Sequence, residues 1–326
     1  MTRSTAFFIN GGAGRVITSI PAFEAYEKEN PNDDFIIVCE AGTDFYKGHP
    51  TLHRRAYDTW HKGLFESFIK ERNCVSPEPY RVWEYYNQKC SLAQAFDIEI
   101  NNKGLRDVSV PSVYLNKIEK AQGENVIKEV KETTGKDKVV VIQPFGRTTE
   151  EDLIDVTSRS FRSEDMLEIA NQLKQDYAVI LMSEIQLNMQ NSKDDNIPIA
   201  QPQIPDIRIW AGVINAADHF LGCDSVGQHI AKALDTQSTV VIGSTYPINT
   251  SYINDPNVEI FDIGEDMRVY SPIRITNEEE PDRINDKCMD LNKTQTKQIV
   301  DSIRKKLGRK NTKPLLQVGG NKWVSG

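Results

Sequence analysis

The sequence contains no apolar run near the roughly 20 residues that a helix needs to span a bilayer. Its first residues, MTRSTAFFINGG, reach glycine too early for a secretory signal peptide. The 5 cysteines are an odd number without a C-x-x-C spacing, which fits neither a disulfide framework nor a zinc site. We therefore expect reduced thiols, no integral membrane association and a location in the cytoplasm.

Basic residues are in deficit, with 39 Lys and Arg against 47 Asp and Glu and a net charge of -8. This balance argues against a surface that binds nucleic acid throughout. The C-terminal end is the exception, because no acidic residue follows Asp301 and the basic ones are Arg304, Lys305, Lys306, Arg309, Lys310, Lys313 and Lys322. This basic C-terminal end leaves nucleic-acid binding open as a function. The alternative is a solvated helix end, where cations are favoured by the helix dipole.

A chain of 326 residues is long enough for two domains at roughly 100 to 200 residues each. Two alternations of buried strands and amphipathic helices predict two doubly wound parallel sheets, an α/β fold. We expect an N-terminal domain over 1–125, with an aromatic and His-rich insertion over 42–120, and a C-terminal domain over 137–292. A docking helix over 293–310 and a basic tail over 311–326 follow. No internal repeat is evident.

Residues at strand-to-helix turns are the candidates for ligand binding, because parallel α/β sheets bind ligands beyond the carboxyl ends of their strands. The stretch INGGAGRVITSIP places Gly11, Gly12 and Gly14 at the first such turn. In FLGCDSVGQHIAKAL, the side chains of Asp224 and Ser225 start a helix and His229 lies one turn further along. These residues predict a diphosphate site, the alternative being a helix cap and a packed histidine.

Two further turns carry polar groups toward the same crevice. Ser244 follows the strand STVVIG, and Arg147 and Thr148 follow the strand KVVVIQPFG. Arg159 precedes the next helix. Arginine suits a phosphate because its guanidinium is planar and always charged, although each of these side chains could equally be solvated.

The glycine loop, the QPFG and SRSF elements and above all GCDSVGQHIAKALDTQSTVVIGSTYP resemble the heptosyltransferase-like glycosyltransferases of family 9. The resemblance implies the GT-B fold, in which two Rossmann-like domains face each other across a cleft. It also implies a nucleotide-diphosphate sugar as substrate, no metal and no cofactor. The family motif D-[TS]-G-x-x-H has Val226 at its glycine position here, and Gly227 follows.

The resemblance also assigns roles to single positions. It places Asp224, Ser225 and His229 around the donor, directs Arg159 and Thr148 at its phosphates and makes Glu184 a candidate for the nucleoside. The acceptor, a saccharide of the lipopolysaccharide kind, would bind the N-terminal domain.

Arg15 occupies the position at which the family carries an aspartate that acts as general base. Because arginine takes up no proton at physiological pH, we interpret Arg15 as an electrostatic clamp on a phosphate. The base would then be Glu40, Asp44 or a histidine of the insertion such as His49.

Three alternatives stay open. The enzyme could retain configuration and need no such base. It could act on modified bases in DNA, where Lys and Arg contact phosphates. The protein could also bind a nucleotide sugar without catalysis.

Overall fold

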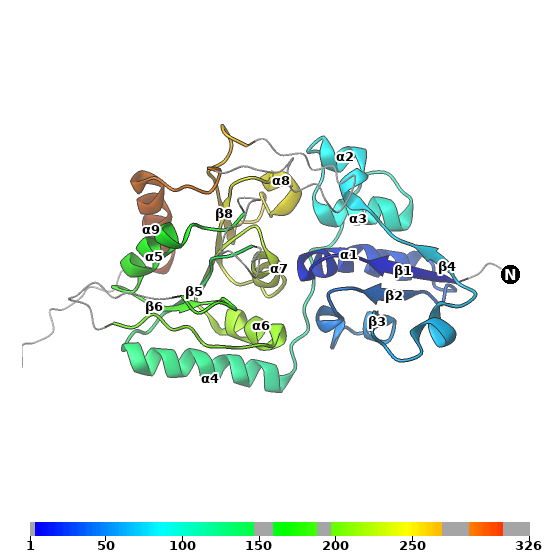
Figure 1. The fold of residues 1–326 in the computed structure, drawn as a ribbon, viewed down its shortest axis with the longest axis horizontal. Coiled ribbons are helices and arrows are strands. Elements are labelled where there is room, and N and C mark those ends of the chain that lie inside the picture. Colours follow the sequence, from blue (N-terminus) through cyan, green and yellow to red (C-terminus); the bar gives the residue numbers. More distant parts are fainter. Residues whose placement is uncertain (1–3, 147–158, 188–196, 269–286, 309–326) are drawn as a thin grey trace, which may run out of the picture.

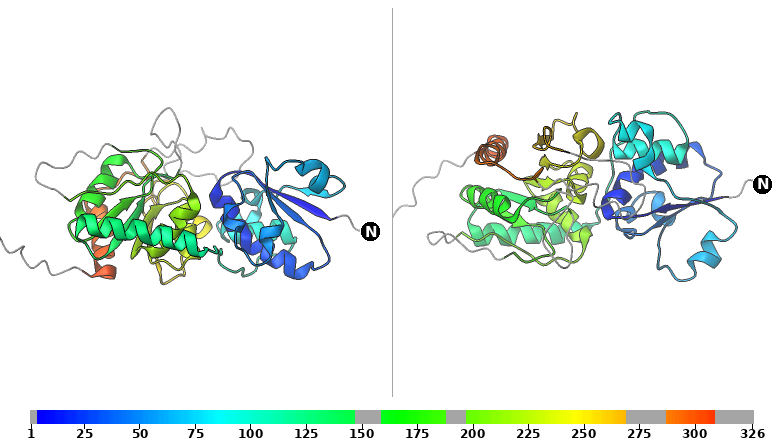
Figure 2. Two further views of the ribbon diagram at one scale, coloured as in Figure 1. Left: turned by 90° about the horizontal axis from the view of Figure 1, so that it is seen from below. Right: turned by 45° about the horizontal axis from the view of Figure 1, so that its top comes forward.

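A computed structural model describes residues 4–146, 159–187, 197–268 and 287–308, which form two α/β units lying side by side (Figures 1 and 2). The first unit contains a parallel sheet with the strand order β3-β2-β1-β4. Its strands are β1 (Thr5–Ile9), β2 (Ile36–Cys39), β3 (Ala56–Asp58) and β4 (Asn73–Val75). Its helices are α1 (Ala13–Glu29), α2 (Trp83–Tyr86) and α3 (Leu92–Asn101), with the short helical turns η1 (Asp44–Tyr46), η2 (Leu52–Arg54), η3 (Phe65–Ile69) and η4 (Pro79–Arg81).

The second unit contains a parallel sheet with the order β6-β5-β7-β8-β9. Its strands are β5 (Val139–Gln143), β6 (Ala178–Leu181), β7 (His219–Cys223), β8 (Ser238–Ile242) and β9 (Val258–Asp262). Its helices are α4 (Lys117–Thr134), α5 (Ser163–Leu173), α6 (Ile207–Ala216), α7 (Val226–Ala233), α8 (Pro247–Thr250) and α9 (Lys293–Leu307).

Helices cover both faces of the second sheet, as its continuously buried strands require. On one face lie α4, α6 and α7, and on the other α5 and α9, whose Ile299, Val300 and Ile303 are buried in that layer. The expected doubly wound α/β fold is confirmed.

The segment 42–120, expected as an insertion, belongs up to the start of α4 at Lys117 to the body of the first unit. It supplies strands β3 and β4 to the sheet and α3, which packs on α1. Each strand is only 3 residues long and lacks a fully buried residue, so neither produces a hydrophobic run that sequence analysis could detect.

Helix α4 crosses residue 125, where we placed the end of the first domain, and lies along the second unit (Figure 1). It packs on α6 so closely that a Cβ on Gly123 would lie 2.1 Å from the carbonyl carbon of Gly212. The second unit therefore begins at α4, because the two glycines let the helix backbones touch.

Two buried polar contacts join the units beside the direct packing of α1 on α7. The guanidinium of Arg208, 2% exposed, donates to the Glu119 carboxylate and to the carbonyl oxygens of Asp44 and Tyr114. On the other side of α1, the amide of Asn249 donates to the carbonyl oxygens of Tyr85 and Cys90 at 2.9 and 2.8 Å.

Candidate functional site

Strand order reverses between β5 and β7 in the second sheet, which is where such a sheet opens a crevice for a ligand. The loops that follow these strands meet there. A Cβ on Gly146 would lie 3.0 Å from the carbonyl oxygen of Asp224 and 3.2 Å from Cβ of Arg159. The sequence prediction that these residues share one edge of the sheet is consistent with this geometry.

The N-terminus of α7 is held by Gln143, the last residue of β5. Its side-chain oxygen accepts from the N–H of Gly227 at 2.9 Å, and its amide donates to Oγ of Ser225 at 3.0 Å. A Cβ on Gly227 would stand 2.2 Å from that side-chain oxygen, so only glycine fits. Because Ser225 accepts this bond and its side chain caps nothing, its O–H and the N–H of Val226 are left for a further hydrogen-bond partner.

Asp224 connects three segments of the second unit. Its carboxylate accepts from the hydroxyl of Thr245 at 2.9 Å and from the amide of Gln228 at 3.0 Å. Asp224 therefore fixes the loop after β8 against α7. Ser244, which we expected to contact the donor, is 1% exposed and lies beneath this surface, so a ligand could reach it only after rearrangement.

The glycine loop ends β1 and begins α1. Gly11 has φ +87, which suits glycine, and its N–H donates to the carboxylate of Glu40 at the end of β2. Gly12 is the N-cap of α1 without a side-chain cap, and the first turn contains no acidic residue. The N–H groups of Ala13 and Gly14 thus remain available at the positive end of the helix dipole.

His229 of α7 lies against the start of α1. A Cβ on Gly14 would stand 3.8 Å from Cδ2 of His229, so the ring edge that carries Nε2 faces the first turn of α1. The other ring nitrogen, Nδ1, is 2.8 Å from the hydroxyl of Tyr252. Burial lowers the pKa of His229 to about 4, so the ring is neutral at physiological pH.

Arg15 is held within the first unit, although it follows the glycine loop directly. Its side chain is 8% exposed and donates to the carbonyl oxygen of Pro77 at 3.3 Å, with Glu78 at 3.6 Å. The rings of Tyr80 and Phe96 lie 5.1 and 5.7 Å from the guanidinium carbon. This placement differs from the phosphate clamp that we expected, since the guanidinium is directed at Pro77, Tyr80 and Phe96 of its own unit.

The three candidate bases fall in different places. Both nitrogens of His49 are engaged, Nδ1 by the backbone N–H groups of Thr51 and Leu52, and Nε2 by Glu24 at 3.1 Å. His49 is 4% exposed and so stabilises the loop after η1 instead of facing the glycine loop.

Asp44 pairs with Lys47 at 2.5 Å on η1. Glu40, which is exposed, is therefore the candidate whose carboxylate the structure brings to the glycine loop.

The remaining candidates are less well placed or lie outside the structure. Glu184 is exposed after β6, the strand at the sheet edge. Arg147, Thr148 and the basic tail over 311–326 lie outside the described residues. Among the described residues, no group of three or more His, Cys, Asp or Glu side chains is placed to hold a metal ion. In the same part of the chain, every helix is too short or too polar to span a bilayer.

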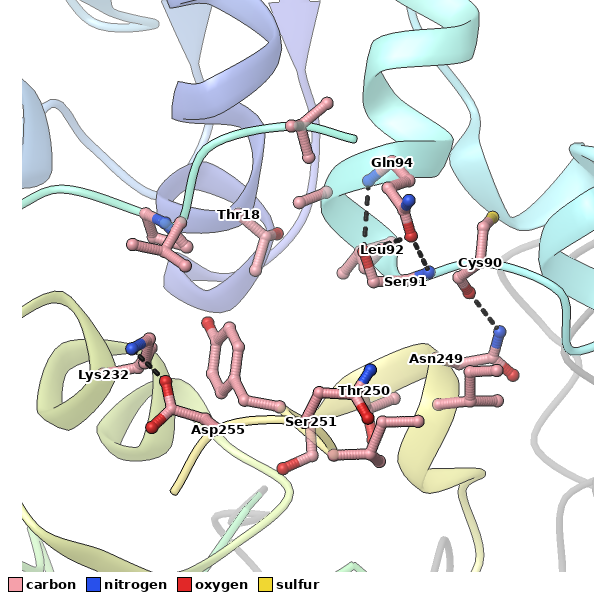
Figure 3. A pocket seen from close by; sticks show the side chains of 18 of the residues that line it. Thr18, Cys90, Ser91, Leu92, Gln94, Lys232, Asn249, Thr250, Ser251 and Asp255 are labelled. Atoms are coloured by element: carbon pink, nitrogen blue, oxygen red, sulfur yellow. Dashed lines mark hydrogen bonds and ion pairs between the residues drawn. The ribbon is translucent and has the colours of Figure 1, made fainter. Parts of the chain in front are cut away.

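A cavity of about 480 Å³ lies between the two units and is lined by both His229 and Tyr252. Figure 3 shows its walls, with Thr18 of α1 and Ser91 at the start of α3 facing Asn249, Ser251 and the ion pair of Lys232 with Asp255. Its volume lies in the range typical of small-molecule sites. The neighbourhood of His229 therefore has room for a sugar-sized group.

Two residues of this site were not predicted from the sequence. Gln143 could have been suspected, because a glutamine ends an otherwise apolar strand, VVVIQ. Tyr252 gives no such signal, since it lies in a loop 23 residues from His229.

No protein-family model matches the sequence, and no curated protein matches it. Solved structures do. A family 9 glycosyltransferase from Veillonella parvula DSM 2008 aligns with a TM-score of 0.65 at 11% identity, over 94% of this chain and 97% of that one. The ADP-heptose heptosyltransferase II of E. coli aligns with a TM-score of 0.56 at 13% identity, over 92% and 99%.

A third similar structure is TibC from enterotoxigenic E. coli H10407, described as an iron-containing dodecameric glycosyltransferase. Its TM-score is 0.56 at 10% identity, and the alignment covers 94% of this chain and 77% of that one. At these identities the likeness establishes the fold. The chain has the two-domain GT-B architecture of these glycosyltransferases, as the resemblance in the sequence implied.

Proposed function

We propose that this protein is a glycosyltransferase that transfers a sugar from a nucleoside-diphosphate sugar to a hydroxyl group of a saccharide. The observation that carries the proposal is the contact of two helix starts: the uncapped first turn of α1 lies against His229, at the end of the first turn of α7. Paired helix N-termini favour an anion such as a diphosphate. Among proteins of this fold, TibC has been solved with ADP-heptose and WaaC of E. coli with ADP.

The donor diphosphate would lie between the two helices. On the α7 side it would accept hydrogen bonds from Ser225, Val226 and Nε2 of His229, and on the α1 side from the first-turn N–H groups. As the bond to the sugar breaks, negative charge grows on the diphosphate, which these fixed donors stabilise. Arg159, Arg147, Thr148 and Glu184 are proposed as further donor-binding residues, on the grounds of their positions in the sequence.

We assign the general base to Glu40. Its carboxylate would take the proton of the acceptor hydroxyl while that oxygen attacks the anomeric carbon, and the electron pair of the breaking C–O bond leaves with the diphosphate. One such displacement inverts the anomeric configuration. Because fixed N–H donors stabilise the leaving group, we propose that turnover needs no metal and survives EDTA.

Experiments distinguish two other functions from this one. A non-catalytic nucleotide-sugar-binding protein would bind the donor without releasing its sugar. Transfer to a modified base in DNA has no support among the described residues, because the basic tail lies outside them. The cytoplasm as the place of action stays a prediction.

A screen of nucleoside diphosphates and their sugars by thermal shift tests the proposal, since a ligand of the folded state raises the unfolding temperature. We expect a selective shift that is lost in His229→Ala. It should be kept in the control Tyr177→Phe, which removes a hydroxyl that donates to the carbonyl oxygen of Gly308. Donors that shift the wild type are then incubated with saccharide acceptors, and release of nucleoside diphosphate is measured. Absence of any shift would overturn the proposal, and binding without release would favour the non-catalytic alternative.

A further inference from the structure

The hydroxyl of Tyr252 and Nδ1 of His229 form a hydrogen bond of 2.8 Å, with the rings edge to face at 83°. Tyr252 follows α8 and its ring packs against Val240, Ile242 and Val258 of the second sheet. The strands therefore fix the position of the phenol. His229 is 6% exposed, so water hardly competes for this bond.

The direction of the bond follows from the protonation states. Burial lowers the pKa of His229 and raises that of Tyr252, so both groups are neutral at physiological pH. Nδ1 is the acceptor within reach of the phenol among the described residues, and a buried O–H without an acceptor is costly. The phenol therefore donates to Nδ1, and the ring proton sits on Nε2.

The Nε2 edge faces the start of α1, where a Cβ on Gly14 would lie 3.8 Å from Cδ2. No described residue bonds Nε2. Nε2–H and the uncapped N–H groups of the first turn of α1 thus offer hydrogen-bond donors from both sides of this contact. A ligand atom that binds both has to accept hydrogen bonds, as a phosphoryl oxygen does.

We propose that Tyr252 is a positioning residue that holds His229 in the Nε2–H tautomer and so makes it a hydrogen-bond donor to a phosphoryl oxygen between α7 and α1. The assignment of the tautomer, the first part of the proposal, rests on the geometry of the free protein. The hydrogen bond to a ligand, the second part, rests on the proposed function.

The tautomer is tested by NMR of the free protein, labelled with ¹⁵N at its 5 histidines, because ring nitrogen shifts and couplings distinguish Nε2–H from Nδ1–H. The His229→Gln variant assigns the signals. We expect the Nε2–H form in the wild type and in Tyr177→Phe, and a mixture in Tyr252→Phe, which keeps the packed ring. An Nδ1–H form in the wild type, or an unchanged tautomer in Tyr252→Phe, would overturn the proposal.

The ligand part is tested by titration with the nucleoside diphosphate that gives the largest thermal shift. We expect Tyr252→Phe to weaken its binding about tenfold, the effect of one lost oriented hydrogen bond. Equal affinity of wild type and Tyr252→Phe would overturn this part. If no diphosphate binds the wild type while the tautomer shifts as expected, the proposed function fails and the positioning by Tyr252 stands.

Discussion

Gly14 and His229, one from each unit, face each other so closely that a Cβ on Gly14 would stand 3.8 Å from Cδ2 of the histidine. This is an ordinary van der Waals distance, so a methyl group fits there and a longer side chain would fill the space beside Nε2. The contact places an uncapped helix N-terminus opposite a neutral imidazole. It is the basis for placing the diphosphate of the donor here.

Substitutions of Gly14 by side chains of increasing length test this placement. Gly14→Ala should keep nucleotide binding and add up to about 1 kcal/mol of stability, because alanine favours a helix. Gly14→Leu should weaken binding at least about tenfold, a loss of about 1.4 kcal/mol, by blocking the space. Isothermal titration measures the affinity, and thermal unfolding confirms that both variants fold. Wild-type affinity in a folded Gly14→Leu protein would contradict the placement.

Glu40→Gln should separate binding from chemistry. The amide keeps the size of the side chain but takes up no proton, so we expect turnover to fall by about 10² to 10⁴ while donor affinity stays within a factor of about two. Asp44→Asn, on the ion-paired turn η1, is the matched control and should retain most of the turnover. Steady-state release of nucleoside diphosphate measures both variants. A Glu40→Gln enzyme as fast as the control would remove Glu40 as the base.

Strands β1, β2, β5, β6, β7 and β8 and the turn at Asp224 and Ser225 could be predicted from the sequence, because buried strands and turn residues leave local signals. The short strands β3 and β4 could not, and neither could the direction of Arg15. Its partners Pro77, Tyr80 and Phe96 lie more than 60 positions away, and their packing turns the guanidinium into the first unit. The bond between His229 and Tyr252 depends on tertiary structure in the same way.

Arg15→Met should therefore affect stability more than ligand binding. Methionine keeps an unbranched side chain beside Tyr80 and Phe96 but loses the cation–π contacts with these rings and the hydrogen bond to Pro77, so we expect a loss of about 1 to 2 kcal/mol. Urea unfolding measures the stability and titration the nucleotide affinity, which should change less than in His229→Ala. If Arg15→Met loses nucleotide binding at unchanged stability, Arg15 is the phosphate clamp after all.

Acid should destabilise the protein through two buried histidines. Burial lowers the pKa of His219 to about 3 and that of His229 to about 4, against about 6.5 in an unfolded chain. The unfolded state therefore binds more protons, and stability that is complete above about pH 6.5 falls as the pH drops. Each histidine contributes about 1.4 kcal/mol per pH unit in this range.

Urea unfolding at pH 7 and pH 5.5 measures this loss above the range in which most carboxylates titrate. We expect the wild type to lose about 2 to 3 kcal/mol and His219→Gln to lose about half as much. His53→Gln changes an exposed histidine and should behave like the wild type. Equal losses in the wild type and His219→Gln would show that His219 is not the source.

The most direct measurement is a crystal structure of the protein with a nucleoside diphosphate that raises its unfolding temperature. The account predicts that the diphosphate lies between α1 and α7, with a phosphoryl oxygen within hydrogen-bonding distance of Nε2 of His229 and of a first-turn N–H group of either helix. A diphosphate bound elsewhere, with the space between Gly14 and His229 empty, would contradict it.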